Sequence, residues 1–154
     1  QGDVMKESMT VAKTLAWSLT PKDQRDKIQE EFSKSSNKGI HIHCPEGAVP
    51  KDGPSAGGAI TVALYSLMND VKIDNNIGMT GEISLQGKIT AIGGLDLKII
   101  GGIRAGIKRF IYPHENAKEF SEFMEKYENN PIVDGITFTP VNDIHEVLEI
   151  VLIK

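Results

Sequence analysis

The chain has 154 residues, which fits one domain, and a domain of this size can bury a core without disulfides or metal. Hydrophobic residues make up 40% and charged residues 25%, as in an ordinary soluble globular protein, which excludes long disorder, a collagen-like chain and a disulfide scaffold. The net charge of −4, from 17 basic and 21 acidic residues, argues against a protein that works on nucleic acid or on an anionic membrane.

In residues 1–44 the sequence predicts one helix and one strand, with a charged segment between them. Residues 3–19 read as a helix, because Asp3 can cap its start and apolar residues recur at the spacing of one helical face. Residues 22–38 are highly charged and end in a Ser-, Asn- and Lys-rich stretch, which indicates a surface loop there. Residues 40–44 alternate between apolar and polar side chains, which predicts a strand.

The second part opens on residues 45–54, a loop whose three prolines and two glycines exclude regular structure. Residues 55–69 then form an almost wholly apolar helix that we expect to be buried, and its small first residues allow another backbone to come close. The later predicted elements are strands at 77–83 and 85–92, a helix at 95–105, a strand at 109–112, a helix at 117–126, a strand at 136–138 and a helix at 143–150. This order predicts a mixed α+β or α/β domain in one piece, without an internal repeat.

Ser55 stands where the rigid loop turns into the apolar helix. Its side chain is expected at the positive end of the helix dipole, beside backbone N–H groups that lack helical partners. That place suits a nucleophile, because the hydroxyl is presented and an oxyanion can be stabilised next to it. Position alone, however, favours the simpler interpretation that Ser55 caps the helix.

A serine nucleophile needs a base, and histidine is the first candidate. His41 and His43 lie upstream on the predicted strand and would complete a Ser-His-Asp triad. No Gly-x-Ser-x-Gly elbow surrounds Ser55, which weakens that hypothesis.

Lys98 is the second candidate base. A lysine accepts a proton only when its pKa falls well below the ordinary value, and burial among apolar groups lowers the pKa in this way. Lys98 follows the Gly93-Gly94 turn, and we expect Leu95, Leu97 or the apolar serine helix to desolvate it.

The chain closely resembles the proteolytic domain of Lon proteases from residue 2 to about residue 148, and six segments carry the resemblance. They are DVMKES at 3–8, HIHCPEGA at 41–48, PKDGPSAG at 50–57, MTGE at 79–82, GGL at 93–95 and GIK at 106–108. PKDGPSAG is the most specific of these motifs, and Lys98 follows Ser55 at the spacing of the family.

The resemblance implies a Ser-Lys dyad peptidase in a single compact α+β domain of the Lon proteolytic type, with a mixed sheet and packed helices. Ser55 matches the nucleophile and Lys98 the general base. Thr80, in the MTGE segment, matches a threonine that hydrogen-bonds the lysine and orients it. The positions of the serine loop that would hold the oxyanion or contact substrate are Glu46, Asp52 and Gly53.

The resemblance also implies a larger assembly. Residues 1–154 would be an N-terminally truncated proteolytic domain, without the ATPase module and the N-terminal substrate domains of a Lon protease. We therefore expect no cofactor in this chain, and ATP and magnesium only in the ATPase module. The full-length protein would be an ATP-dependent hexameric ring that degrades unfolded or damaged proteins in the cytoplasm or the mitochondrial matrix. No membrane partner is expected, and this domain gives no indication of DNA binding.

Other functions are less well supported by the residues. The segment from Gly81 to Lys88 mimics a phosphate-binding loop, but five rather than four residues separate its glycines, and Ile89 replaces the magnesium-binding Ser or Thr. The four histidines and one cysteine show no metal-ligand spacing, so no metal site is predicted.

Two alternatives to a peptidase stay open at this stage. A non-proteolytic Lon-like scaffold domain, as in the ring-forming RadA-type proteins, lacks the dyad, so the presence of Ser55, Lys98 and Thr80 argues against it. A small-molecule hydrolase would need a binding cleft, and no segment of the sequence identifies one.

Overall fold

The computed structural model describes residues 2–34 and 53–153. Its helices are α1 (Asp3–Leu19), α2 (Lys22–Lys34), α3 (Gly57–Asn69), α4 (Leu95–Arg104), α5 (Ala117–Tyr127) and α6 (Ile144–Val151). Its strands are β1 (Ile77–Met79), β2 (Glu82–Ile83), β3 (Ile89–Thr90), β4 (Arg109–Pro113) and β5 (Thr137–Val141). Two short 3₁₀ helices, η1 (His114–Asn116) and η2 (Pro131–Val133), precede and follow α5.

The main sheet is built around β4, which pairs in parallel with β1 on one side and with β5 on the other. Parallel neighbours need a crossover, and α4 and α5 supply it on the way into and out of β4. The strands β2 and β3 form a separate antiparallel pair, with Glu82 opposite Thr90. The expected α+β fold is confirmed, and the parallel and antiparallel pairs of the expected mixed sheet are found in two separate sheets.

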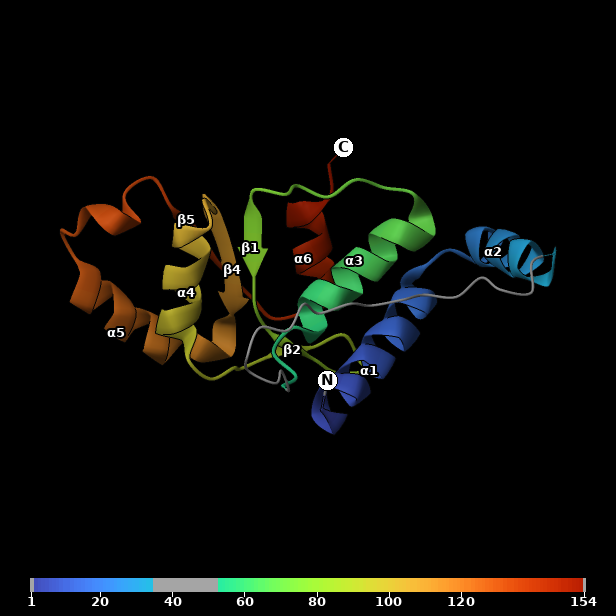
Figure 1. Ribbon diagram of the computed structural model, residues 1–154, viewed down its shortest axis with the longest axis horizontal. Coiled ribbons are helices and arrows are strands. Elements are labelled where there is room, and N and C mark those ends of the chain that lie inside the picture. Colours follow the sequence, from blue (N-terminus) through green and yellow to red (C-terminus); the bar gives the residue numbers. More distant parts are fainter. Residues whose placement is uncertain (1, 35–52, 154) are drawn as a thin grey trace.

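Alternating side chains of β4 divide the core between the two faces of the sheet. Phe110 and Tyr112 pack with α4 and α5 in one apolar cluster. Ile111 points the other way, into a cluster built from α3, α6 and the end of β5. Figure 1 shows the same division, with α4 and α5 on one side of the strands and α3 and α6 on the other.

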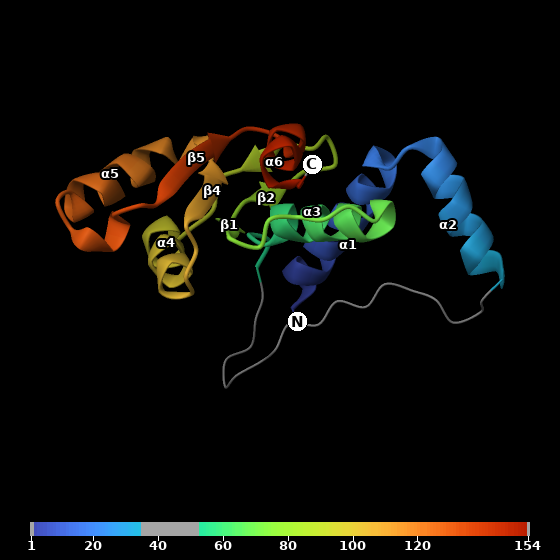
Figure 2. The ribbon, with the colours of Figure 1, turned by 90° about the horizontal axis from the view of Figure 1, so that it is seen from above.

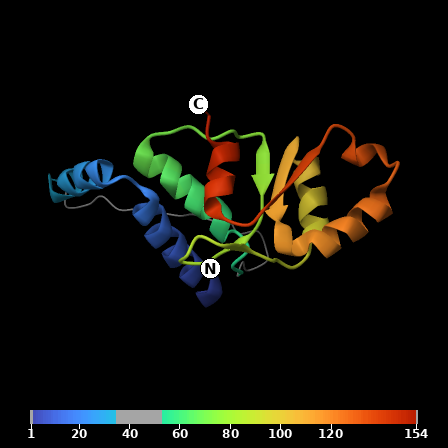
Figure 3. The same ribbon diagram turned by 180° about the vertical axis from the view of Figure 1, so that it is seen from behind.

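The helix α1 covers α3 on the side away from the sheet (Figure 2). Two buried alanines of α1, Ala12 and Ala16, lie against Leu64 and Met68 of α3 in a third cluster. From behind, α6 is seen beside α3 (Figure 3). The helix α3, which follows Ser55, is therefore packed by helices on two sides.

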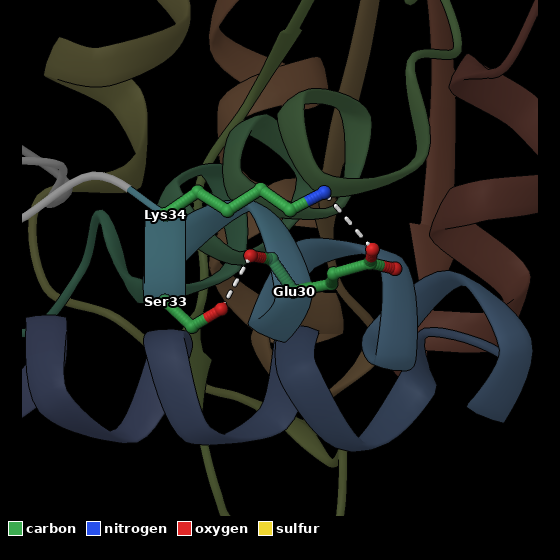
Figure 4. Close-up of polar contacts among 3 residues, drawn as sticks. All are labelled: Glu30, Ser33 and Lys34. Atoms are coloured by element: carbon green, nitrogen blue, oxygen red, sulfur yellow. Dashed lines mark hydrogen bonds and ion pairs between the residues drawn. The ribbon is translucent and has the colours of Figure 1, made fainter.

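The helix α2 is absent from the predicted order of elements, because its highly charged sequence offers only a narrow apolar face. None of its residues is fully buried, although Ile28 packs against the cluster of α1 and α3. Exposed i, i+4 ion pairs join Lys22 to Asp26 at 3.2 Å and Lys34 to Glu30 at 3.0 Å, and Ser33 donates to the Glu30 carbonyl at 2.7 Å (Figure 4). Such pairs support an isolated helix by a few tenths of a kcal/mol each.

The predicted strands at 77–83 and 85–92 are shorter than expected. The first is interrupted between β1 and β2. The Thr80 amide still donates to Ile111 of the neighbouring strand β4, but the Gly81 amide donates to the carbonyl of Ser55, outside the sheet. The second is reduced to β3 by the turn before it, where Gly87 has a φ of +86° that favours glycine. The predicted strand at 40–44 lies outside the described residues, as does most of the loop at 45–54.

None of the helices in the two described ranges combines the length and the apolar character that crossing a membrane would need.

Candidate active site

Ser55 lies two residues before α3 rather than inside it. The helix begins at Gly57 and its N-cap is Ala56, which has helical dihedral angles and makes no side-chain capping bond. The interpretation that Ser55 caps the helix is therefore wrong. A tight turn holds the segment, because the amide of Gly57 donates to the carbonyl of Pro54 at 3.0 Å. The hydroxyl of this half-buried serine is thus not used to start the helix.

The small residues at the start of α3 bring neighbouring segments into close contact, as expected from the sequence. A Cβ at Gly57 would come within 2.7 Å of the Ile83 Cγ2 atom and 2.8 Å of the Ser8 hydroxyl. At Gly58 the amide donates to the carbonyl of Gly81 at 3.0 Å. Side chains at these two positions would push α3 away from both α1 and β2.

Thr80 and Gly81 connect the serine segment to the central strand. The amide of Gly81 and the hydroxyl of Thr80 both donate to the carbonyl of Ser55, at 2.9 Å and 3.4 Å. The amide of Thr80 donates to the carbonyl of Ile111 in β4 at 3.2 Å. Thr80 is buried, and its hydroxyl keeps lone pairs that could accept a further hydrogen bond.

Lys98 lies in the first turns of α4, whose apolar side faces the α4–α5 cluster. Leu95 and Ile99 on that side are buried, and Lys98 between them is half-buried. Its amide donates to the carbonyl of Gly94 at 3.1 Å, and Gly94 has a left-handed conformation, with φ +69°, at the N-cap. Leu97 is 75% exposed, so the expectation that it desolvates Lys98 is wrong.

Burial and a neighbouring carboxylate act in opposite directions on the Lys98 ammonium. Desolvation lowers the pKa of Lys98 below its ordinary value, and this is the larger effect. The negative charge of Glu82, in β2, raises the pKa of Lys98 and partly offsets it. Glu82 belongs to the MTGE motif, but the sequence alone assigns it no role. Its interaction with Lys98 depends on how β2 and α4 are placed relative to each other.

The predicted site residues are brought together in part. Ser55 and Thr80 are in direct contact through the serine carbonyl. Among the hydrogen bonds of the described residues, none joins the Ser55 hydroxyl to the Lys98 ammonium. Gly53 is half-buried just ahead of the serine turn. The proposed substrate-loop residues Glu46 and Asp52 lie outside the described residues, and so do His41 and His43.

Within residues 2–34 and 53–153, no group of three His, Cys, Asp or Glu side chains is placed so that it could hold a metal ion.

The fold and the site define an α+β domain with a serine and a lysine as candidates for catalysis. Comparison with known proteins identifies the family to which this domain belongs. The family model described as the Lon protease (S16) C-terminal proteolytic domain matches residues 1–154. The chain belongs to this family of Lon proteolytic domains.

Individual relatives agree with the family model. The chain is 41% identical to the Lon protease of Buchnera aphidicola subsp. Schizaphis graminum, over 98% of this chain and 18% of that protein. It is 42% identical to the Lon protease of Fervidobacterium nodosum and 43% identical to that of Flavobacterium johnsoniae, over 98% of this chain and 17% of each of those proteins. The chain thus spans less than a fifth of the length of the curated relatives it matches.

Proposed function

We propose that this chain is the peptidase domain of a Lon protease and that it hydrolyses peptide bonds through a Ser55–Lys98 dyad. The observation that carries the proposal is the Ser55 hydroxyl, which precedes α3 without capping it in a chain of the Lon proteolytic family. The half-buried Lys98, with its lowered pKa, supports the assignment of the base.

In the proposed reaction, neutral Lys98 accepts the proton of the Ser55 hydroxyl while the serine oxygen attacks the carbonyl carbon of the peptide. Backbone N–H groups around Asp52, Gly53 and Ser55 stabilise the oxyanion that forms. The Lys98 ammonium then gives its proton to the leaving amine, and an ester on Ser55 remains. Water, deprotonated by Lys98, hydrolyses that ester and restores the serine.

Thr80 takes the role of orienting Lys98 in this proposal. Its hydroxyl donates toward the Ser55 carbonyl, so the remaining lone pairs of the oxygen are available to the lysine. A hydroxyl used in this way holds the amine near the serine in either protonation state. Glu46 belongs to the loop that would contact the substrate.

The wider context of the proposal follows from the relatives, of which this chain covers only 17–18%. We propose that the whole protein is an ATP-dependent hexameric ring in the cytoplasm or the mitochondrial matrix, and that its substrates are unfolded or damaged proteins. ATP and magnesium would bind to an ATPase module, and this chain would need no cofactor of its own.

Covalent capture of the serine tests the proposal. A peptide-like sulfonyl fluoride or boronate is incubated with the chain, and the modified residue is located by mass spectrometry after digestion. We expect modification at Ser55 and none in the Ser55→Ala variant. The matched control is Ser33 in α2, an exposed serine whose neighbour in the chain is a lysine, Lys34 (Figure 4). Equal modification of Ser33 and Ser55 would overturn the assignment of the nucleophile.

A further inference from the structure

The side chain of Asn116 binds the main chain just before α4 through both the oxygen and the nitrogen of its carboxamide. Its Oδ1 atom accepts the amide of Ile92 at 3.0 Å, and its Nδ2 atom donates to the carbonyl of Ile92 at 2.9 Å. Asn116 is fully buried, and Ile92 is 8% exposed, so water does not compete for these groups. Loss of the carboxamide would leave two buried main-chain groups without partners.

The neighbouring residue extends the contact by one position. A carboxylate oxygen of Glu115 accepts the amide of Ala91 at 3.0 Å. Consecutive residues of η1 therefore bind consecutive residues of the segment between β3 and α4. We call the four residues Glu115, Asn116, Ala91 and Ile92 the η1 clamp.

The η1 clamp lies a short distance along the chain from Lys98. After Ile92, two glycines turn the chain, and the left-handed Gly94 forms the N-cap of α4. The first helical residue, Leu95, is 2% exposed in the same apolar cluster as Ile92. The Asn116–Ile92 hydrogen bonds thus fix where α4 begins, and the buried Leu95 fixes how the helix is rotated about its axis. Both residues of this segment, Ile92 and Leu95, lie within six positions of Lys98.

The strand β4, which leads into η1, also holds the serine side of the site. The η1 helix follows β4 directly, and Ile111 in β4 accepts the amide of Thr80 at 3.2 Å. Thr80 in turn contacts the carbonyl of Ser55. The strand β4 and the η1 helix that follows it therefore connect by hydrogen bonds to both segments that carry the proposed dyad.

We propose that Asn116 is a positioning residue for Lys98: by binding Ile92 it fixes the start of α4 so that the lysine amine stays desolvated and directed toward the serine segment. This inference rests on the proposed function, because it assigns Lys98 the role of base. Asn116 itself is placed on main-chain atoms and has no assigned contact with the substrate.

The test compares Asn116→Ala with Asn116→Asp and with a matched control. The aspartate keeps the shape and the acceptor for the Ile92 amide, but it loses the donor to the Ile92 carbonyl. Asn69 in α3 is the control, since its Nδ2 atom also donates two hydrogen bonds within the protein. These go to the Thr20 hydroxyl at 3.1 Å and to the Tyr65 carbonyl at 3.0 Å. Asn69 belongs to the end of α3 remote from Ser55.

Peptide turnover is measured across pH, well below the thermal midpoint of each variant. For Asn116→Ala we expect kcat to fall by up to about 100-fold with little change in KM, because a displaced base misaligns the reaction. The alkaline rise of the pH profile should move to higher pH, since a loosened α4 returns water to Lys98. Asn116→Asp should also lower kcat, but its added negative charge would by itself raise the pKa of Lys98, so the shift of the profile is judged on Asn116→Ala. Asn69→Ala should lower the thermal midpoint without moving the profile.

A second measurement does not depend on peptidase activity. The side-chain amine of Lys98 is titrated by NMR in the wild type, in Asn116→Ala and in Asn69→Ala, with Glu82 as the charged group that faces it. Both substitutions leave the net charge unchanged, so a rise of the Lys98 pKa in Asn116→Ala alone supports the clamp, even if the chain proves inactive and the proposed function fails. Equal titration of Lys98 in all three proteins, or an Asn116 variant that loses stability with an unchanged pH profile, would show that Asn116 has only a structural role.

Discussion

The amide of Gly81 donates a hydrogen bond of 2.9 Å to the carbonyl of Ser55, and the amide of Gly58 returns one of 3.0 Å to the carbonyl of Gly81. These main-chain hydrogen bonds connect the turn before α3 to the junction between β1 and β2, and the Thr80 hydroxyl adds a further one to the Ser55 carbonyl at 3.4 Å. Because no side chain at Ser55 takes part, the hydroxyl can be removed without loosening this connection. Mutation of Ser55 can therefore test the role of its hydroxyl without disturbing the fold.

Ser55→Ala is expected to abolish cleavage of short unstructured peptides. The free energy of unfolding should stay within about 0.5 kcal/mol of the wild type, because the serine does not cap α3 and its carbonyl contacts persist. Turnover of a fluorogenic peptide and the urea midpoint measure the two effects.

The control for Ser55→Ala is Ser33→Ala in α2, where the hydroxyl donates to the Glu30 carbonyl at 2.7 Å on the exposed surface. It should retain full activity. Near wild-type turnover by Ser55→Ala would show that another group is the nucleophile.

Lys98→Met and Lys98→Arg are both expected to be inactive, the first because the base is gone and the second because a guanidinium stays protonated. The folded pKa of Lys98 is lowered, so burying its ammonium costs stability at pH values below the unfolded pKa. That cost is greatest below the folded pKa and fades as the pH rises toward the unfolded value. Lys98→Met removes it and should be at least as stable as the wild type at pH 7 in a urea titration.

Lys34→Met is the matched control for Lys98→Met. Lys34 is paired with Glu30 at 3.0 Å, and 73% of its side chain is exposed, so its loss should change neither turnover nor the urea midpoint noticeably. A Lys98→Met protein that is markedly less stable would identify Lys98 as a paired structural cation instead of a desolvated base.

Glu82→Gln is expected to move the pH dependence of peptide cleavage to lower pH. The carboxylate raises the pKa of Lys98, so its removal lets desolvation lower that pKa further. A larger fraction of the lysine is then neutral at pH 7, and the alkaline rise in kcat/KM begins earlier. Glu30→Gln in α2 should leave the profile where it is, and a shift of the Glu82→Gln profile to higher pH would contradict the assignment of Lys98 as the base.

Local signals in the sequence predicted most of the fold correctly. The helix at 95–105 appears as α4, because a Gly-Gly turn precedes two buried apolar residues four positions apart, Leu95 and Ile99. The close approach at Gly57 and Gly58 was also predicted, since only small residues stand at that position. Where a helical pattern is bounded by residues that start and stop a helix, the sequence alone is enough to predict the helix.

The features that escaped prediction depend on contacts between distant segments. The predicted strand is interrupted after Thr80 because the amide of Gly81 is taken by the carbonyl of Ser55, which lies outside the sheet. Asn116 binds Ile92 across 24 positions of the chain, and no local pattern marks an asparagine for that use. The exposure of Leu97 follows from the rotation of α4 against its neighbours, which a run of apolar residues does not fix. The Ser55–Lys98 dyad itself stays a prediction.

Gly81→Ala is expected to weaken both the fold and the site. A Cβ at this position would lie 2.6 Å from the Cγ2 atom of Ile89, which is 2% exposed and has no space into which to retreat. Overpacking of this kind costs about 1–3 kcal/mol. Because the Gly81 amide holds the Ser55 carbonyl, any shift that relieves the clash also displaces the serine turn, so peptide turnover should fall at temperatures where the variant remains folded.

The control for Gly81→Ala is Gly101→Ala in α4, where a Cβ would meet no atom within 4 Å. Alanine is the better helix former by up to about 1 kcal/mol, so this variant should be as stable as the wild type or slightly more stable, with unchanged turnover. Thermal midpoints and peptide turnover of the two variants, measured side by side, separate the effect of the clash from the effect of adding a methyl group. If Gly81→Ala matched the control in both measurements, the contact between the β1–β2 junction and the serine turn would not be needed for activity.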